Sequence, residues 1–598
     1  MGDFILDFRD KNRISSKDAD ELKFYDDMNI EFIGYNAFSL ALSSSEGSDI
    51  WKSFSSNEDN IFVALCGKIA MDAGEWKCAS AFEKTKSAAC KAIFKKYKAD
   101  GLDELLPYLN GNYIVFIYDG RINTFYLITD RWGMVPGFTP GANSGLFSSH
   151  PDILARLAHS NKDLDYVSFT EFIVTGKLSW PYTYYKSIQS LDYGAVYEFD
   201  LGSIPFRCKG SKKYFEFTFD VEHNASEWDL AEELAAAFKK AVQRRTLPLF
   251  GKIAFSLSGG LDSRTLLCAA EHKDNICAFS FFDEENLEYA TAKAIAKEAG
   301  VELIPLTRNF EHYGDFAEEG MKISGGMGSL GNNHFLGFRD IYRQFGFDNV
   351  LTGFYCDYMF KALVLDHTET PVMRKEIFSP FIYENYQKYL WLNSVYTGEV
   401  KARLHSLFPD HLTTQNSEIS RQIIAHRRFY PLCYEPDNME TTIPRRVMNF
   451  YLPTIDNSIL DVYQKIKPSY KLNKSMFQKM VRLVCGNKVS DIIDTNTGVK
   501  VGASRFSTTL SRYFNALKRK MKKGKSYSEG SWPNWYYYRK NSKKIASLML
   551  MKKDETKDVL IHLYGKEDMS HLLNNYKTIH MKSFLRFFTI KMWLDVNM

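Results

Sequence analysis

One short stretch, Ser258-Gly-Gly-Leu-Asp-Ser263, combines hydroxyl groups, glycines and a carboxylate within six residues. The apolar run Ile253–Leu257 before it has the length of a buried strand, and a helical pattern follows from Arg264. Gly259 and Gly260 lack a Cβ, so they allow a sharp turn and a close approach to a ligand. A helix that begins after such a turn offers free N–H groups and the positive end of its dipole. The stretch therefore predicts an anion site.

Asp262 places a carboxylate where the backbone favours an anion. This makes chemical sense if the carboxylate holds Mg²⁺, which bridges it to a phosphate. The hydroxyls of Ser258 and Ser263 add donors, and no lysine follows, which distinguishes the stretch from the common Gly-Lys-Ser/Thr nucleotide loop. It resembles the pyrophosphate loop of ATP pyrophosphatases, which split ATP between the α and β phosphates. The alternative is a strand–helix turn whose glycines only relieve crowding.

The chain has 598 residues, of which 45% are hydrophobic and 25% charged, as in ordinary globular proteins of several domains. A net charge of +4 is too small to indicate a nucleic-acid partner. The nine cysteines show no paired spacing, which argues against a zinc site or a disulfide framework. The start lacks the layout of a signal peptide, and no apolar run is long enough to span a membrane. We expect a cytoplasmic protein.

The first two hundred residues contain short alternating strands around one helical stretch, Lys84–Lys98. The last two of these strands read as a hairpin, and together they predict a sheet-rich α/β layer domain. The predicted strands are Asn60–Met71, Asn112–Gly120 and Thr124–Gly133.

After a linker the pattern changes to strands alternating with helices, which predicts a doubly wound parallel sheet with its ligand at the carboxyl ends of the strands. Ser280 and Phe281 end the strand next to the Ser258 loop, so we expect them to border the adenine. Beyond about residue 365 the chain reads as mostly helical. Its one strongly basic run, Leu517–Lys540, reads as a connector, although such composition can also bind nucleic acid or acidic membranes.

Two blocks together resemble the glutamine-dependent asparagine synthetases: Leu109–Pro136, with its Asp-Arg-x-Gly-x-x-Pro, and the Ser-Gly-Gly-Leu-Asp-Ser stretch. The segments Thr183–Phe199 and Leu452–Arg482 follow in the same order as in that family. The resemblance implies an N-terminal-nucleophile-type αββα sandwich. An ATP pyrophosphatase domain of the adenine nucleotide α-hydrolase (HUP) type follows, with a helical C-terminal part. The implied domains are 1–205, a linker at 206–225, the synthetase domain at 226–510 and C-terminal helices at 511–598.

The glutaminase half departs from the family at three positions. Gly2 stands where the family has its cysteine nucleophile, which uses the free α-amine as base. Cys66-Gly67 replaces the Asn-Gly that serves substrate and oxyanion, and Ala88 replaces the aspartate that grips the glutamine amine. We expect a structural N-terminal domain without glutaminase activity, as in the similar β-lactam synthetases and lasso-peptide cyclases.

The synthetase half keeps Gly353 and Asp357 of the family's second loop within Leu351–Phe360, so Asp262 and Asp357 are expected to hold Mg²⁺ together. Phe354 replaces the family glutamate near the acyl-adenylate. The family's late lysine is not evident. The predicted nucleotide-binding residues are Ser258, Gly259, Gly260, Asp262, Ser263, Ser280, Phe281, Thr352 and Gly353, the metal ligands are Asp262 and Asp357, and the catalytic candidates are Lys500 and Lys474.

These observations predict an ATP-dependent ligase that activates a carboxylate as an acyl-adenylate for attack by an amine or ammonia. The expected cofactors are ATP and Mg²⁺, and the acid is a small molecule, a sugar acid or a peptide. Two alternatives stay open: a glutamine-hydrolysing asparagine synthase, and a degenerate homologue that binds a nucleotide or a partner without catalysis. The sequence leaves the oligomeric state open, a homo-oligomer included.

Overall fold

The structure is a computed structural model of the 598-residue chain. It describes residues 2–598 except 12, 45–48, 81–85, 204–205, 220–224, 362, 364, 366–393, 408–421, 424–425, 428, 473, 505, 509, 512, 515–527 and 530–531. Much of the predicted basic run Leu517–Lys540 therefore lies outside the described residues, as does part of the predicted linker.

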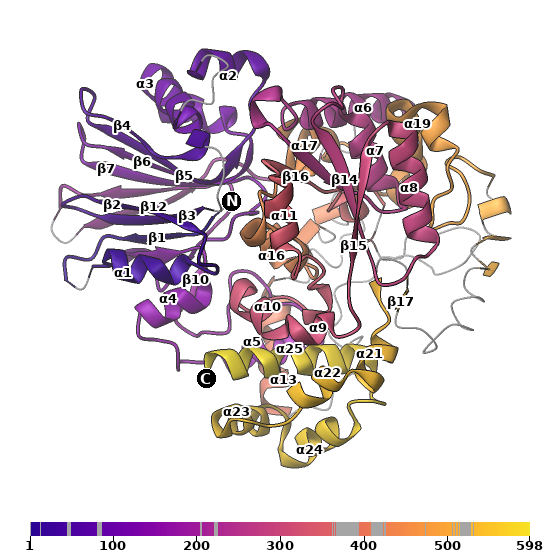
Figure 1. The fold of residues 1–598 in the computed structure, drawn as a ribbon. Helices are drawn as coiled ribbons and strands as arrows, with labels where there is room; N and C mark the ends of the chain where they lie inside the picture. The colour runs from indigo at the N-terminus through magenta and orange to yellow at the C-terminus, as the bar shows by residue number, and fades with distance from the viewer. Residues whose placement is uncertain are drawn as a thin grey trace.

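The N-terminal half contains two stacked antiparallel sheets with helices on their outer faces (Figure 1). One sheet has the order β10 (Gln189–Ser190), β8 (Phe138–Thr139), β9 (Leu146–Ser148), β1 (Phe4–Asp7), β3 (Ser39–Ser44) and β2 (Asn29–Gly34). The other has the order β12 (Arg207–Lys213), β11 (Ala195–Asp200), β7 (Thr124–Thr129), β6 (Gly111–Asp119), β5 (Ile61–Ile69) and β4 (Phe54–Ser56). The predicted hairpin is confirmed, because β6 pairs antiparallel with β7.

The neighbouring strands β5 and β6 are buried on both faces, which explains why they read as nearly continuous apolar runs. Aromatic side chains such as Phe8, Phe116 and Phe125 fill the space between the sheets. The outer face of β5 and β6 packs on α3 (Ala88–Tyr108), next to α2 (Ala73–Ser80). The other sheet lies against α1 (Ser16–Ala19) and α4 (Pro151–Leu157) (Figure 1).

Strand β12 lies within the stretch that the sequence predicts as a linker. It pairs with β11 along the edge of the second sheet, and its side chains are almost all exposed. A basic edge strand is usual, because charged side chains there discourage pairing with other chains. Cys208 is its one apolar residue, which explains why sequence periodicity does not reveal it.

The C-terminal half is built around a parallel sheet. Its order is β15 (Glu302–Thr307), β14 (Ile276–Phe282), β13 (Ile253–Ser256) and β16 (Asn349–Leu351). The helices beside it in Figure 1 include α6 (Glu227–Gln243), α7 (Leu261–Ala269), α8 (Leu287–Ala299), α17 (Asn457–Tyr463) and α19 (Ser475–Ser490). Antiparallel sheets followed by a parallel sheet confirm the predicted mixed α/β class.

Several of the remaining helices, the C-terminal α25 (Met581–Asn597) among them, lie below the parallel sheet in Figure 1. Helix α25 packs on α10 (Ala317–Ser324) and also on α5 (Tyr166–Thr175) of the N-terminal half. Among the described residues, no helix is both long and apolar enough to cross a membrane. The other helices are α9 (His312–Asp315), α11 (Arg339–Phe345), α12 (Cys356–Phe360), α13 (Ser394–Leu407), α16 (Met439–Val447), α18 (Pro468–Leu472), α21 (Trp535–Asn541), α22 (Lys543–Leu548), α23 (Asp554–Tyr564) and α24 (Lys566–Asn575).

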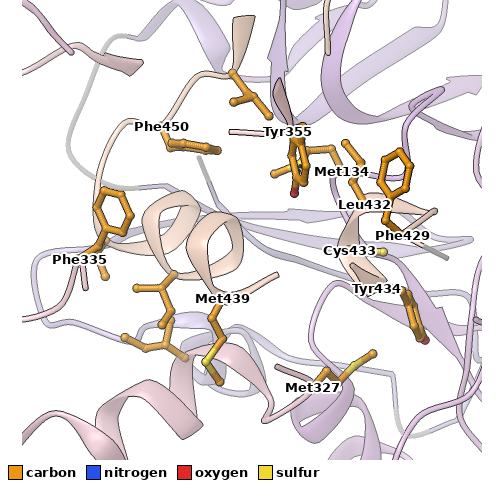
Figure 2. Close-up of a cluster of buried hydrophobic side chains, with 14 of the residues drawn as sticks. Met134, Met327, Phe335, Tyr355, Phe429, Leu432, Cys433, Tyr434, Met439 and Phe450 are labelled. Carbon is orange, nitrogen blue, oxygen red and sulfur yellow. Dashed lines mark hydrogen bonds between the residues drawn. The ribbon is translucent and has the colours of Figure 1, made fainter. Parts of the chain in front are cut away.

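Buried ion pairs and apolar contacts join the two halves. Asp3 directly precedes β1 and is fully buried. Its carboxylate accepts hydrogen bonds from Arg445 and Arg446 of α16. Figure 2 shows Met134 of the N-terminal half beside Tyr355 and Leu432 of the C-terminal half. The N-terminal sandwich therefore supports α16, which also carries residues of the candidate site.

Candidate functional site

A cavity of about 290 Å³ lies at the carboxyl ends of β13, β14 and β16. This is where an open parallel sheet usually binds its ligand. Its described lining residues are Ser256, Leu257, Ser258, Gly260, Asp262, Ser263, Phe281, Glu288, His334, Phe335, Thr352, Gly353, Phe354, Tyr355, Asp357, Tyr358, Leu363, Glu435, Asp437, Glu440, Thr441, Asn496 and Trp532. The structure thus brings most of the predicted nucleotide-binding residues into one place.

The predicted anion loop is the turn from β13 into α7. Its two serines hold it closed: the Ser258 N–H donates to Ser263 Oγ over 3.0 Å, and the two hydroxyl oxygens lie 3.1 Å apart. Helix α7 begins after Gly260 without a side-chain cap on its first turn. The first N–H groups of this helix therefore stay available for an anion, as the sequence predicts.

Arg264, which the sequence analysis did not single out, fixes this loop. It is fully buried, and its guanidinium donates to the carbonyls of Gly259 and Gly260 and to those of Ile492 and Ile493. Gly259 is required here, because a Cβ would lie 2.4 Å from Thr495 Cγ2. Arg264 thus supports the backbone of the loop from behind, and its own donors are used in doing so.

A second loop follows β16 and leads into α12. Gly353 allows it to pack tightly on the first loop, since a Cβ there would lie 2.8 Å from Asp262 Cβ. Tyr355 takes a positive φ of 71° and turns its buried ring inward, where its hydroxyl lies 3.2 Å from Thr441 Oγ1. The tight contact of the two loops places Asp262 and Asp357 near each other.

Lys361 lies between these two aspartates. Its ammonium Nζ is 2.6 Å from the Asp262 carboxylate and 2.9 Å from Asp357 Oδ1, and its side chain is only 4% exposed. Burial raises the pKa of Asp262 to about 6, even though the Lys361 charge acts in the opposite direction. Burial opposes ionisation of Asp357 too, but there the Lys361 charge prevails and lowers the pKa. Lys361 therefore brings a positive charge into direct contact with both carboxylates.

The two carboxylates match the donors that Mg²⁺ uses beside phosphates, which are one or two carboxylates completed by phosphate oxygens and water. The kind of donor therefore fits. Lys361 holds the place between them, so a metal ion there competes with its ammonium group. Among the described residues, no group of three or more potential metal-binding side chains is found.

The other predicted site residues lie at different distances from the cavity. Phe281 lines it, whereas Ser280 is buried beside it with an Oγ that has no hydrogen-bond partner among the described residues. The positive charge of Lys474 acts on both aspartates, although Lys474 is not part of the described lining. Lys500 is more than half exposed and pairs with Asp491 over 3.3 Å, outside that lining.

Three further carboxylates line the cavity and were missed by sequence analysis: Glu435, Asp437 and Glu440. We call them the acidic wall. They come from the turn after Leu432–Tyr434 and from the start of α16. Burial raises the pKa values of Glu435 and Glu440 well above the ordinary value, and neighbouring carboxylates add to the effect. Their spacing in Glu-Pro-Asp-Asn-Met-Glu is the one sequence feature that could have revealed them.

The position that the resemblance assigns to a glutaminase nucleophile, residue 2, is closed in this structure. Gly2 is buried, and a Cβ on it would lie 1.4 Å from the carbonyl oxygen of Ser43, so no side chain fits. The Gly2 carbonyl accepts a hydrogen bond of 2.7 Å from Arg445. Burial raises the pKa of the nearby Cys66 thiol to about 12, and this thiol donates to the carbonyl oxygen of Gly2.

A family model for the glutamine amidotransferase domain matches residues 76–214. The matched part runs from within α2 to just past β12, so it includes the edge strand that sequence periodicity missed. The match supports the amidotransferase-type half of the resemblance drawn from the sequence. A comparison with curated proteins finds no match to the chain.

Proposed function

We propose that this protein is an ATP-dependent amide ligase of the asparagine synthetase-like type. It activates a carboxylate as an acyl-adenylate, releases pyrophosphate and transfers the acyl group to an amine. The observation that carries the proposal is the meeting of two loops, Ser258–Ser263 and Thr352–Asp357, in one cavity at the ends of parallel strands. The amidotransferase match to the N-terminal half supports the same family relationship.

The residues have distinct roles in this proposal. The N–H groups at the start of α7 and the hydroxyls of Ser258 and Ser263 bind phosphate oxygens. Phe281, at the end of β14, borders the base. Asp262 and Asp357 would hold Mg²⁺, which when bound neutralises charge on the phosphates. Lys361 lies at the same point and supplies positive charge to the departing pyrophosphate. The sequence analysis named Lys500 and Lys474 as the catalytic candidates instead.

Tyr358 and Asp437 form a candidate acid–base pair near the reacting acid. The Tyr358 hydroxyl donates to Asp437 Oδ2 over 2.7 Å, and both side chains line the cavity. Phe354, which replaces the family glutamate, instead packs between Phe335 and Phe450. The proton-transfer function is therefore assigned to groups outside the Phe354 position.

The N-terminal half is proposed to be structural. Its nucleophile position is filled by the Gly2 backbone and closed to any side chain, which argues against the glutamine-hydrolysing alternative. The amine must then come from another source. The degenerate-homologue alternative is favoured by one observation, the ammonium of Lys361 at the place proposed for the metal ion.

Pyrophosphate release separates these functions. Protein supplied with MgATP, a panel of carboxylic acids and a primary amine is expected to form pyrophosphate and AMP in an acid-dependent manner. Asp262→Asn should abolish this release, whereas Asp491→Asn, an exposed carboxylate paired with Lys500, should not. Release of orthophosphate, or of nothing across the panel, would favour the degenerate homologue. Glutamate formed from glutamine would favour a glutaminase.

A further inference from the structure

The acidic wall is the least compensated part of the cavity. Six carboxylates line the cavity, and its described lining contains neither lysine nor arginine. Lys361 compensates Asp262 and Asp357 from behind, but among the described residues no ion pair or hydrogen bond joins it to the wall. Within the wall, the donors to the Asp437 carboxylate among the described residues are neutral: the Tyr358 hydroxyl and the Asn332 amide.

Glu440 is the clearest case. It is 9% exposed, and its Oε1 has no hydrogen-bond partner among the described residues. Its electrostatic neighbours Asp437, Glu435 and Asp357 are all acidic. Glu435, 2% exposed, accepts the N–H of Asp437 over 2.8 Å, and the charge of Lys177 acts on it without outweighing its burial. A buried carboxylate with only acidic neighbours, as Glu440 is, is costly, so the arrangement indicates a positive charge that arrives with a ligand.

Two further polar atoms of the lining lack partners among the described residues, His334 Nε2 and Thr352 Oγ1. Both side chains are more than nine-tenths buried. His334 Nδ1 receives donors from Arg308 and from the Tyr313 hydroxyl, so it must be the acceptor nitrogen. The proton of the neutral ring therefore sits on Nε2, which offers a donor to a ligand. Buried polar groups rarely stay unpaired, so these atoms also point to a bound molecule.

We propose that the amine substrate of the ligase binds as a primary ammonium ion against Glu440, with Glu435 and Asp437 completing its negative surroundings. This assignment rests on the proposed function and names its substrate class: primary alkylammonium compounds small enough for a cavity of about 290 Å³. An ammonium ion fits better than a metal ion, because no cluster of three metal-binding side chains is found among the described residues.

The wall then prepares the amine for reaction. One N–H proton of the ammonium ion passes to the Glu440 carboxylate, which leaves a lone pair on nitrogen. This pair forms the new C–N bond at the acyl carbon, and the C–O bond to AMP breaks with its electron pair staying on AMP. The second proton lost by nitrogen goes to the Asp437 carboxylate of the candidate acid–base pair. The products are the amide and AMP, and no oxidant or reductant is needed.

Binding of simple amines tests the assignment on the full-length protein. Butylammonium is the probe, and butanol is the uncharged control of similar shape. Calorimetry should show saturable binding of butylammonium and none of butanol. Glu440→Gln should weaken butylammonium binding at least tenfold, whereas Glu302→Gln, an exposed glutamate outside the cavity lining, should leave it unchanged.

Thermal unfolding adds a second readout. Without ligand, Glu440→Gln should raise the midpoint temperature of unfolding, because it removes an uncompensated buried carboxylate. If Glu440 served only to stabilise the fold, the same substitution would lower that temperature. Any of three results would overturn the assignment: a lower unfolding midpoint for Glu440→Gln, a butylammonium affinity of Glu440→Gln equal to that of the wild type, or no butylammonium binding by the wild type. MgATP binding without amine binding overturns the amine site and leaves the ligase standing. Amine binding without MgATP binding supports the site and counts against the ligase.

Discussion

Replacing Lys361 by methionine tests the charge arrangement at the centre of the cavity. The substitution keeps the length and apolar stem of the side chain but removes the ammonium that joins Asp262 and Asp357. Removing one partner of a buried ion pair typically costs about 3–5 kcal/mol, because the other charge stays buried and unpaired. Most of this cost belongs to Asp262, since the Asp357 side chain is 54% exposed and contributes at most about 1 kcal/mol.

The pKa of Asp262 determines how the stability deficit of Lys361→Met changes with pH. Its folded-state pKa, about 6, lies above that of an unfolded aspartate, so its favourable contribution is present at low pH and lost as pH rises through the folded value. Loss of the Lys361 charge raises this pKa further. The stability deficit of Lys361→Met should therefore be larger at pH 8 than at pH 5.

Urea unfolding at both pH values, with and without Mg²⁺, measures these effects. If Mg²⁺ and the ammonium compete for one place, Mg²⁺ should stabilise Lys361→Met more than the wild type. The free energy of unfolding rises by about 2.7 kcal/mol when the Mg²⁺ concentration is a hundredfold above its dissociation constant. Adding Asp262→Asn to Lys361→Met should restore stability without metal. An unchanged unfolding free energy of Lys361→Met would refute the ion bridge, and equal Mg²⁺ effects on both proteins would refute the shared place.

Three further predictions concern the N-terminal half and the anion loop. The protein should release no glutamate from glutamine, and Cys66→Ser should retain pyrophosphate release. If the wild type releases glutamate and Cys66→Ser does not, the N-terminal half is a working glutaminase and the prediction is wrong. Asp3→Asn should cost about 3 kcal/mol at pH 7, because two buried arginines lose their counter-ion. Burial opposes ionisation of Asp3, but its arginines hold its pKa well below the ordinary value of about 4. Its contribution to the free energy of unfolding is therefore lost as pH falls. The stability deficit of Asp3→Asn, measured by urea unfolding, should accordingly shrink at pH 3. Arg264→Lys should weaken MgATP binding roughly tenfold in calorimetry, since one ammonium cannot replace a guanidinium that donates to five carbonyls, that of Val489 included, at about 1 kcal/mol each. Unchanged affinity would show that the loop needs no such support.

Local features of the fold were predictable from the sequence because they depend on neighbouring residues. The strand, turn and helix around Ser258–Ser263 follow from an apolar run, two glycines and helical spacing. Parallel pairing follows from alternating strands and helices, and it brings the loops after β13 and β16 to the same edge. The convergence of Asp262 and Asp357 was thus expected from topology.

Features that depend on long-range contacts were not predictable. Lys361 is four residues from Asp357 but 99 from Asp262, so its bridging position exists only once the loops meet. Lys500 resembled a catalytic candidate in sequence, yet solvent and Asp491 surround it. The acidic wall lies in an irregular stretch without periodicity, so no sequence pattern marks it. Its role depends on the burial of its carboxylates in the cavity lining, which the sequence alone does not reveal.

Binding of MgATP to the full-length protein tests the central claim most directly. Calorimetry should give a saturable isotherm for the wild type and for Asp491→Asn. Asp262→Asn should lose at least tenfold in affinity, because it removes a carboxylate at the junction of both loops while Lys361 stays in place. No binding by the wild type, or equal affinity in Asp262→Asn, would contradict the assignment of this cavity to ATP.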